Sequence, residues 1–379
     1  MDGLDLNSGL LDKRLDGASF GARAAGMKKR PYLPDESLTT AAALAVLLGQ
    51  PLLLSGLPGV GKTGAAYHIA SRLFGEGHEP VRFTVTTQTS GRDLLYKFDM
   101  LGRFHDKKGR PLRDFLRFEA LGRAIVAACG GGAEVLDAAT DDPVIDPGRI
   151  WEIVGDTPRQ PGPLLIRDLL QPRDALSDTP APTVVLIDEI DKAPRDTPND
   201  LLESFEAMRF TIDELGLKIG TRDAARDDAE RRRSRPIVVA TTNAENNLPD
   251  AFLRRCVFHE IAMPDEKRMR EIVSAHLHLV DGLDPGGADA LADTAFAIGT
   301  EVARRVKGSS RVPGTAEYIA LARAMHASPA TAAGLRQAMA GTAGAVPPDL
   351  IKALLGVLVK TADDLAKALA VFPSIALAR

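Results

Sequence analysis

The sequence predicts an α/β protein in which helices surround a five-stranded parallel sheet, followed by an all-helical C-terminal domain. Several short apolar runs are continuous rather than alternating, which is typical of strands that are covered on both faces. Helical patterns separate several of these runs, as expected for the crossover connections of a parallel sheet. After Pro264 the strand signals stop, and alanine-rich helical patterns continue to the end of the chain.

The first expected element is a helix in the stretch PDESLTTAAALAVLLG, residues 34–49. Asp35 and Ser37 are both candidates for its N-cap, and Gly49 is typical of a helix end. A second helical stripe of apolar residues follows at 65–74. Together these two patterns predict one helix before the first strand and one after it.

The strands are expected where apolar residues run without interruption. The predicted runs are PLLLS (51–55), VRFTVTT (81–87), TVVLIDE (183–189), PIVVATT (236–242) and FHEIAM (258–263). A further stretch, MRFTIDELGLKIG at 208–220, indicates a β-hairpin with a Leu-Gly turn. The sequence thus predicts five strands for the main sheet and a separate hairpin.

Changes in composition divide the chain. Residues 1–30 are rich in Gly, Asp and Arg, and we expect a flexible N-terminal arm there. The α/β domain is expected at 31–265, with an insertion at about 140–182 that holds many prolines and aspartates, and the helical domain at 266–379. The charged stretch 222–235 is expected to be a solvated loop, although its RRRSR segment leaves contact with nucleic acid as an alternative.

Composition also narrows the possible functions. The chain has 379 residues, 45% apolar and 26% charged, as is typical of soluble globular proteins. Its net charge of −4 argues against general electrostatic capture of nucleic acid. The two cysteines, Cys129 and Cys256, match no metal or redox spacing and favour a reducing compartment. Without a secretory signal pattern or an apolar run long enough to cross a bilayer, the sequence predicts a cytoplasmic protein without membrane insertion.

The stretch GLPGVGKT at 56–63 fits the phosphate-loop pattern G-x-x-x-x-G-K-[ST]. Its glycines let backbone N–H groups surround a phosphate chain, Lys62 supplies a positive charge, and Thr63 offers a hydroxyl to Mg²⁺. A glycine-rich turn without a ligand is the alternative, but the strand before and the helix after favour the phosphate loop. The expected nucleotide-binding residues of this loop are Gly56, Pro58, Gly59, Val60, Gly61, Lys62, Thr63 and Gly64.

Two adjacent acids follow the buried run that ends in LIDE. Asp188 is expected at the carboxyl end of that strand, where it can hold the Mg²⁺ shell, and Glu189 can polarise an attacking water. The alternative is an exposed acidic turn. Because a protein that only binds nucleotide would need just the first acid, the pair favours hydrolysis. Asp191 is expected to cap the following helix.

The next strand ends in TTN, which places Asn243 at its tip, where its amide could orient the same water. An Asn at a strand end is otherwise an ordinary turn former. Arg254 and Arg255 follow on a short helix near Cys256. A guanidinium supplied across a subunit boundary can neutralise phosphate charge during transfer, whereas the alternative is a pair of surface arginines.

These motifs, in this order, resemble those of the AAA+ ATPases, and in detail those of the MoxR family. The similar stretches are YLPDESLTTAAALAVLLGQPLLLSGLPGVGKT, DEIDKAPRDTPNDLLESFEAMRFTI and TTNAENNLPDAFLRRCVFHEIAMPD, and together they cover most of residues 31–265. The resemblance implies an αβα core, a helical lid domain, and assembly into a ring that is commonly hexameric. It also implies that the 208–220 hairpin lies near the pore of that ring.

The resemblance assigns roles to residues by position. It implies that the phosphate loop is Walker A, that Asp188 and Glu189 are Walker B, and that Asn243 is sensor 1. Arg254 or Arg255 would be the arginine finger. For sensor 2, Arg311 is favoured because it precedes a lid helix. Arg304 and Arg305 are the alternatives for that role. The resemblance also implies that ATP and Mg²⁺ are the cofactors, with Thr63 and Asp188 as metal ligands.

Three functions are compatible with these motifs. The favoured one is a ring ATPase that hydrolyses Mg-ATP to remodel or activate a protein partner. The MoxR resemblance implies a partner with a von Willebrand factor A domain, which must be a separate chain because no Asp-x-Ser-x-Ser pattern is present here. The alternatives are a nucleic-acid-directed motor, such as a restriction subunit built on a related AAA+ domain, and a regulatory module that binds nucleotide without turnover.

Overall fold

The computed structural model describes residues 32–156, 158–159, 161–171, 174, 176–220, 233–306, 313–328, 331–342 and 346–373. The expected N-terminal arm, Arg311, and most of the charged stretch at 222–235 lie outside these residues. The chain divides into two compact units. Within the described residues, Asp35–Ser55 and Ala65–Glu260 belong to the first unit, and 32–34, Gly56–Gly64 and the residues from Ile261 onward belong to the second.

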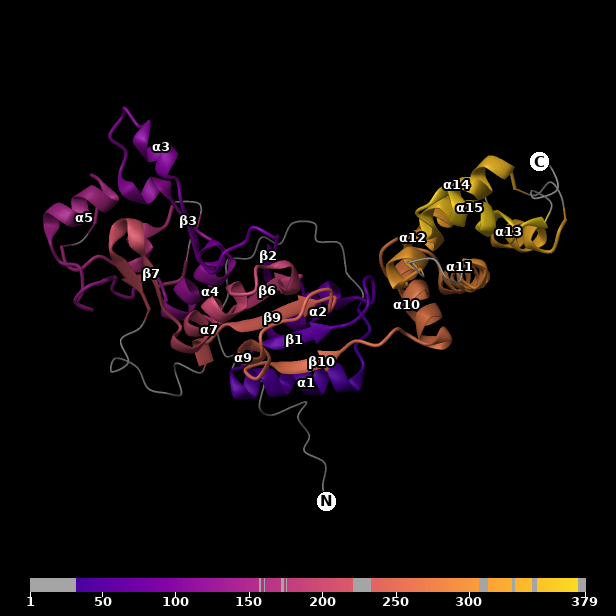
Figure 1. The fold of residues 1–379 in the computed structure, drawn as a ribbon, viewed down its shortest axis with the longest axis horizontal. Coiled ribbons are helices and arrows are strands. Elements are labelled where there is room, and N and C mark those ends of the chain that lie inside the picture. Colours follow the sequence, from indigo (N-terminus) through magenta and orange to yellow (C-terminus); the bar gives the residue numbers. More distant parts are fainter. Residues whose placement is uncertain are drawn as a thin grey trace, which may run out of the picture. The chain divides into compact units, whose positions relative to one another are not determined.

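The regular elements of the described residues include both helices and strands up to Glu260 and are helical afterwards (Figure 1). The strands are β1 (Leu52–Ser55), β2 (Val81–Thr84), β3 (Tyr96–Phe98), β4 (Leu116–Phe118), β5 (Leu136–Asp137), β6 (Val184–Asp188), β7 (Phe210–Ile212), β8 (Leu217–Ile219), β9 (Ile237–Thr242) and β10 (Val257–Glu260). The α-helices of the first part are α1 (Glu36–Leu48), α2 (Lys62–Phe74), α3 (Met100–Phe104), α4 (Ala120–Cys129), α5 (Pro147–Val154), α6 (Ile166–Leu169), α7 (Thr197–Ala207) and α9 (Asp250–Leu253). Those of the second part are α10 (Glu266–Leu279), α11 (Pro285–Arg305), α12 (Thr315–His326), α13 (Ala332–Met339), α14 (Pro348–Leu358) and α15 (Ala362–Leu369). Short 3₁₀ helices are η2 (Gly91–Leu94), η3 (Leu112–Phe115), η4 (Ile190–Lys192) and η5 (Asp213–Leu215).

The main sheet has five strands in the order β10-β1-β9-β6-β2, and all of its neighbours are parallel. The prediction of a five-stranded parallel sheet is confirmed. Because all strands run the same way, β1, β6 and β9 end at the same edge of the sheet. The chain therefore leaves β1 toward the phosphate loop at the edge where Asp188 ends β6.

The continuous apolar runs have the burial that was expected of them. Every residue of β6 is buried, from Val184 to Asp188, and α4 packs against this strand and against β2. At the opposite end of the strand order, α1 packs against β1 and β10. Strand β2 lies at the edge and alternates between partly buried and exposed residues, so its polar side chains reach solvent.

Helix α1 begins at the first of its two candidate caps. The Asp35 carboxylate accepts a hydrogen bond of 2.6 Å from the backbone N–H of Leu38, and the Ser37 hydroxyl donates to the same carboxylate. Gly49 ends the helix with φ 65°, a left-handed conformation that favours glycine.

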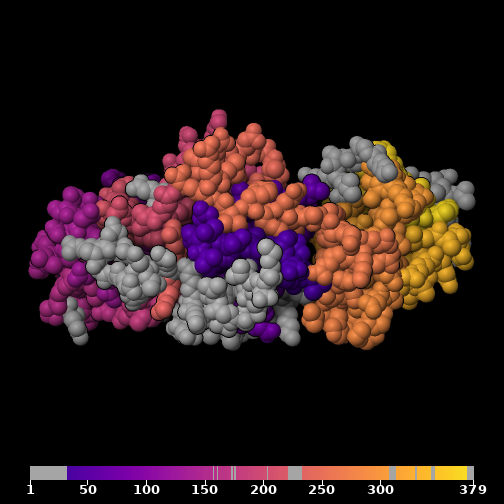
Figure 2. All heavy atoms as spheres, turned by 90° about the horizontal axis from the view of Figure 1, so that it is seen from below, coloured from indigo at the N-terminus to yellow at the C-terminus, as the bar shows by residue number. Residues whose placement is uncertain are grey.

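A small accessory region of short elements lies beside the main sheet, and it includes α5 and α6 from the expected insertion at 140–182. Strands β3 and β4 form an antiparallel hairpin, while β5 extends the β7–β8 hairpin into a three-stranded sheet. In Figure 1, α3 and α5 lie at the end of the first unit that is farthest from β10, and Figure 2 shows this region in purple to magenta on one side of the indigo residues. The side chain of Trp151 on α5 is 65% exposed, so it is not part of the core.

The second unit is helical from α10 to α15 over its described residues after Ile261. Its core is built mainly from Ala, Leu, Val and Ile side chains, such as Ile298 and Leu321, together with Met269 and Phe372. None of the described helices is long and apolar enough to span a membrane.

Candidate functional site

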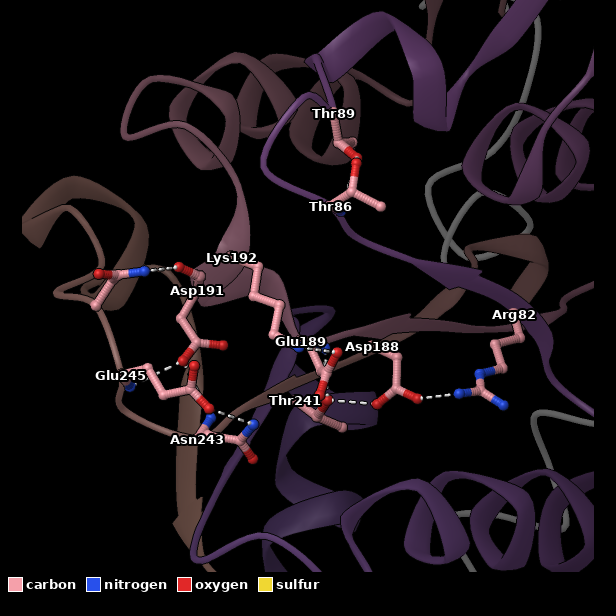
Figure 3. A network of polar contacts seen from close by, with 11 residues as sticks. Arg82, Thr86, Thr89, Asp188, Glu189, Asp191, Lys192, Thr241, Asn243 and Glu245 are labelled. Atoms are coloured by element: carbon pink, nitrogen blue, oxygen red, sulfur yellow. Dashed lines mark hydrogen bonds and ion pairs between the residues drawn. The ribbon is translucent and has the colours of Figure 1, made fainter.

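Polar side chains gather at the carboxyl ends of β6 and β9, two neighbouring strands of the first unit (Figure 3). Asp188 is the last residue of β6, and Glu189 follows it directly. Asn243 follows the last residue of β9 in the same way. The structure therefore brings these three sequence-predicted residues to one edge of the sheet.

Asp188 is a buried carboxylate held by partners on both neighbouring strands. Its side chain is 6% exposed, and its Oδ1 accepts a hydrogen bond of 2.6 Å from the hydroxyl of Thr241 on β9. Its Oδ2 lies 2.7 Å from Nη2 of Arg82 on β2. Because a buried charge is costly unless it is paired, these two contacts explain why a carboxylate is tolerated here.

Glu189 has a left-handed backbone conformation with φ 61°. Such a conformation is uncommon for a residue with a side chain, and it turns the chain sharply at the end of the strand. The backbone N–H of Glu189 donates to the Thr241 hydroxyl at 2.9 Å. Its carboxylate accepts a hydrogen bond of 2.7 Å from Nζ of Lys192, and this contact raises the pKa of Lys192. Both acids thus share Thr241, and Lys192 holds the second acid.

Asp191 does not cap the following helix, which corrects the expectation from the sequence. It is only 2% exposed, and its Oδ2 accepts hydrogen bonds from the backbone N–H groups of Asn243 and Glu245, at 3.2 and 3.0 Å. It therefore fixes the loop that carries Asn243. The Asn243 side chain itself donates to the carboxylate of Glu245 at 3.2 Å.

The phosphate loop between β1 and α2 lies in the second unit. Gly56, Gly59 and Gly61 have φ values of 146°, 83° and 102°, in the range that favours glycine. A Cβ on Gly56 would lie 2.5 Å from the carbonyl oxygen of Ile261, so no larger residue fits there without movement. Nζ of Lys62 donates to the carbonyls of Gly56 and Leu57, at 2.6 and 3.0 Å, so its charge lies inside the loop.

Helix α12 begins beside this loop, within the same unit. A Cβ built on Gly314 would lie 3.1 Å from the carbonyl oxygen of Pro58. The favoured sensor 2 residue, Arg311, precedes α12 and lies outside the described residues. The two alternatives, Arg304 and Arg305, both form ion pairs with Glu301 on their own helix.

The two arginine-finger candidates have different surroundings at the end of α9. Nε of Arg255 donates to the carboxylate of Glu206, and its Nη1 donates to the carbonyl of Ala251. Arg254 is exposed and has no ion pair or side-chain hydrogen bond with any part of the chain that the structure describes. Of the two, Arg254 is the one whose guanidinium is available to another chain.

Other candidate positions lack reactive chemistry or lie elsewhere. Burial raises the pKa of Cys256 to about 12, so its thiol is neutral at pH 7 and is not a nucleophile. Arg235, from the RRRSR segment, donates to the carbonyl of Phe205 at 2.8 Å.

A cavity of about 350 Å³ is lined by Val81 and Val184, at the amino ends of β2 and β6. It lies at the opposite edge of the sheet from Asp188 and is therefore not the phosphate site.

Three residues that contact Asp188 or Glu189 were not predicted from the sequence. Thr241 was within the quoted TTN stretch, and only the strand register identifies it as the partner of Asp188. Arg82 is 106 residues from Asp188 in the chain, and no motif marks it. Lys192 was the easiest of the three to predict, because a Lys three residues after a Glu on a helical turn can reach the Glu carboxylate.

A parallel αβα fold with a phosphate loop after β1 and acids after β6 defines the class of P-loop nucleotide-binding proteins. The family model for the AAA domain of the dynein-related subfamily matches residues 51–256. That match covers more than half of the chain, and the chain belongs to this family of AAA+ ATPases. The AAA domain binds nucleotide, and AAA+ proteins commonly form oligomeric rings.

Two solved structures are similar at low identity. NtrX from Brucella abortus, crystallised in complex with ADP, is 12% identical with a TM-score of 0.39, and the match covers 89% of this chain and 62% of NtrX. This chain thus spans less than two thirds of NtrX. A structure that describes the self-assembly of katanin is 17% identical with a TM-score of 0.31, and covers 89% of this chain and 80% of that one. No curated protein was found to match.

Proposed function

We propose that this protein is a MoxR-type ring ATPase that hydrolyses Mg-ATP to remodel or activate a protein partner. The observation that best supports the proposal is the meeting of Asp188, Glu189 and Asn243 at one edge of the sheet. It is the same edge at which the chain leaves β1 toward the phosphate loop.

Each group has a role that fits its chemistry. Lys62 binds the terminal phosphates, and the backbone N–H groups of the loop at the start of α2 orient them. Glu189 orients and polarises the attacking water, and Asn243 helps to position it. Before hydrolysis the Glu189 carboxylate must turn from Lys192 toward that water, since the two form an ion pair in this structure.

A magnesium ion fits the donor set that these residues provide. No group of three His, Cys, Asp or Glu side chains in the described part of the chain could hold a metal by itself. Mg²⁺ commonly uses one or two protein oxygens and takes its other ligands from phosphates and water. Asp188 and the hydroxyl of Thr63 would be those protein ligands. When bound, Mg²⁺ would neutralise charge on the phosphates.

We further propose that the ring places Arg254 of one subunit at the nucleotide of the next. A finger on a neighbouring subunit requires a head-to-tail interface, which closes into a ring. The β7–β8 hairpin would lie near the pore, and a separate protein with a von Willebrand factor A domain would be the partner. These parts of the proposal rest on the resemblance to the MoxR family and on the guanidinium of Arg254, which forms no ion pair with the described residues.

The proposal is tested by changing Glu189→Gln and measuring two properties. We expect ATP hydrolysis to fall by at least about 100-fold, because a general base contributes roughly that much. Binding of a fluorescent ATP analogue should remain near the parent level, since the phosphate loop is unchanged. Hydrolysis by the variant at the parent rate would exclude the proposed mechanism, and DNA-stimulated turnover in the parent would favour the nucleic-acid motor instead.

A further inference from the structure

Arg82 forms an ion pair with Asp188, although no nucleotide-binding motif includes Arg82. Its guanidinium Nη2 lies 2.7 Å from Oδ2 of Asp188, while Oδ1 of the same carboxylate is occupied by the Thr241 hydroxyl (Figure 3). Arg82 lies on β2 and Asp188 on β6, and these two strands of the main sheet are paired directly. The arginine and Thr241 therefore contact different oxygens of the same carboxylate.

The two partners of this ion pair differ in their freedom to move. The side chain of Asp188 is 6% exposed and is fixed by β6 and by Thr241. The side chain of Arg82 is 46% exposed, because β2 is the edge strand of the sheet. A half-exposed arginine on an edge strand can turn into water at little cost, whereas the buried carboxylate cannot. If the pair separates, Arg82 is the partner that leaves.

A guanidinium and a divalent cation compete for the same carboxylate oxygen, because both are positively charged and repel each other at short range. Mg²⁺ binds carboxylate oxygen at about 2.0–2.1 Å, and the arginine nitrogen is already in hydrogen-bond contact with Oδ2 of Asp188. A guanidinium stays charged at every pH at which proteins fold, so Arg82 cannot relieve the repulsion by losing a proton. Moving away from the carboxylate is the way left to relieve that repulsion.

We propose that Arg82 is the counter-ion of Asp188 in the metal-free protein and is displaced when Mg²⁺-nucleotide binds. Arg82 acts through Asp188 and is a positioning residue. By competing for the carboxylate, it raises the Mg²⁺ concentration that nucleotide binding requires. This inference rests on the proposed function, because it uses Asp188 as a metal ligand.

The experiment measures how binding of the fluorescent analogue N-methylanthraniloyl-ATP depends on free Mg²⁺. In the Arg82→Gln variant, we expect the Mg²⁺ concentration at which enhancement of analogue binding is half-maximal to fall about three- to tenfold. This change is in line with the loss of one partly buried ion pair. Affinity for the analogue without Mg²⁺ should stay the same. The Arg82→Lys variant keeps the charge with fewer hydrogen bonds, so its Mg²⁺ requirement should lie between those of the parent and Arg82→Gln.

Arg92→Gln is the matched control. Arg92 is also an exposed arginine of the first unit, and it pairs at 3.0 Å with Glu214, a carboxylate away from the β6–β9 edge. This control should leave the Mg²⁺ requirement unchanged. An unchanged or increased requirement in Arg82→Gln, or equal shifts in both Gln variants, would overturn the proposal.

A separate variant distinguishes failure of this inference from failure of the proposed function. In Asp188→Asn the dependence of analogue binding on Mg²⁺ should largely disappear. If Asp188→Asn keeps the parent dependence, Asp188 is not the metal ligand and the proposed function fails at that point. If Asp188→Asn loses the dependence while Arg82→Gln behaves like the parent, only the role of Arg82 is wrong.

Discussion

At the residue scale, Thr241 joins the two acids of the candidate site. Its hydroxyl donates to Asp188 and accepts from the backbone N–H of Glu189, and the residue is fully buried. In Thr241→Val, which has nearly the same shape, both hydrogen bonds are lost. We expect the free energy of unfolding to fall by about 2–3 kcal/mol, because one lost bond involves a buried charge. Urea denaturation followed by circular dichroism measures this change.

Thr242→Val is the control for that prediction. Thr242 is also buried, but its hydroxyl accepts a single hydrogen bond from the backbone N–H of Ala244, at 2.9 Å. Its loss should cost only about 1 kcal/mol, the usual contribution of a neutral hydrogen bond. Equal destabilisation by the two substitutions would mean that the hydrogen bonds of Thr241 to the two acids add nothing to the free energy of unfolding.

The residues of the candidate site differ in how far the sequence could predict them. Lys62, Asp188 and Glu189 belong to motifs whose spacing reflects one local chemical requirement, so a single sequence can identify them. Arg82 and Thr241 contact Asp188 only because β2, β6 and β9 are neighbours in the sheet. Hydrophobic periodicity indicates that strands exist, but it does not give their order. Such partners require the three-dimensional structure.

At the scale of elements, the start of α1 can be tested directly. The sequence left Asp35 and Ser37 as equal candidates for the cap, and the structure assigns the role to Asp35. We expect Asp35→Ala to lower the free energy of unfolding by about 1 kcal/mol, the typical cost of losing an N-cap. Ser37→Ala should change it by only a few tenths of a kcal/mol, since Ala is a good helix former. Thermal unfolding of both variants compares the two losses, and a larger loss in Ser37→Ala would contradict the assignment.

The strands show why some elements were easier to predict than others. Strand β6 is buried along its whole length, and its continuous apolar sequence gave a clear signal. The predicted run at 81–87 was too long, because β2 ends at Thr84 and the chain then turns around the side-chain contact between Thr86 and Thr89. Apart from the predicted hairpin at 208–220, the accessory region was not resolved into elements, because β5 has only two residues and its pairing partner β8 is far along the chain. Such short strands carry too little periodicity to be recognised.

At the scale of the whole molecule, the proposed site needs two chains. In the proposed ring, one chain would supply the phosphate loop and the acids, and the neighbouring chain would supply an arginine. Arg255 is already paired with Glu206 of its own chain, whereas Arg254 is exposed and has no side-chain partner in the part of the chain described. The difference allows the assignment of the finger and the ring assembly to be tested together.

Mixing two inactive variants should restore hydrolysis if the finger acts on a neighbour. Lys62→Ala and Arg254→Ala should each abolish ATP hydrolysis alone. In an equimolar mixture, about a quarter of the interfaces would pair an intact Lys62 with an intact Arg254 of the adjacent subunit, if subunits assemble at random in a closed ring. We therefore expect about a quarter of the parent rate per subunit, measured by phosphate release after the subunits have exchanged.

Arg255→Ala should retain hydrolysis by itself, because that arginine is already paired within its own chain. A mixture as inactive as its components would contradict a finger supplied across the interface, and loss of activity in Arg255→Ala with an active Arg254→Ala would assign the finger to Arg255.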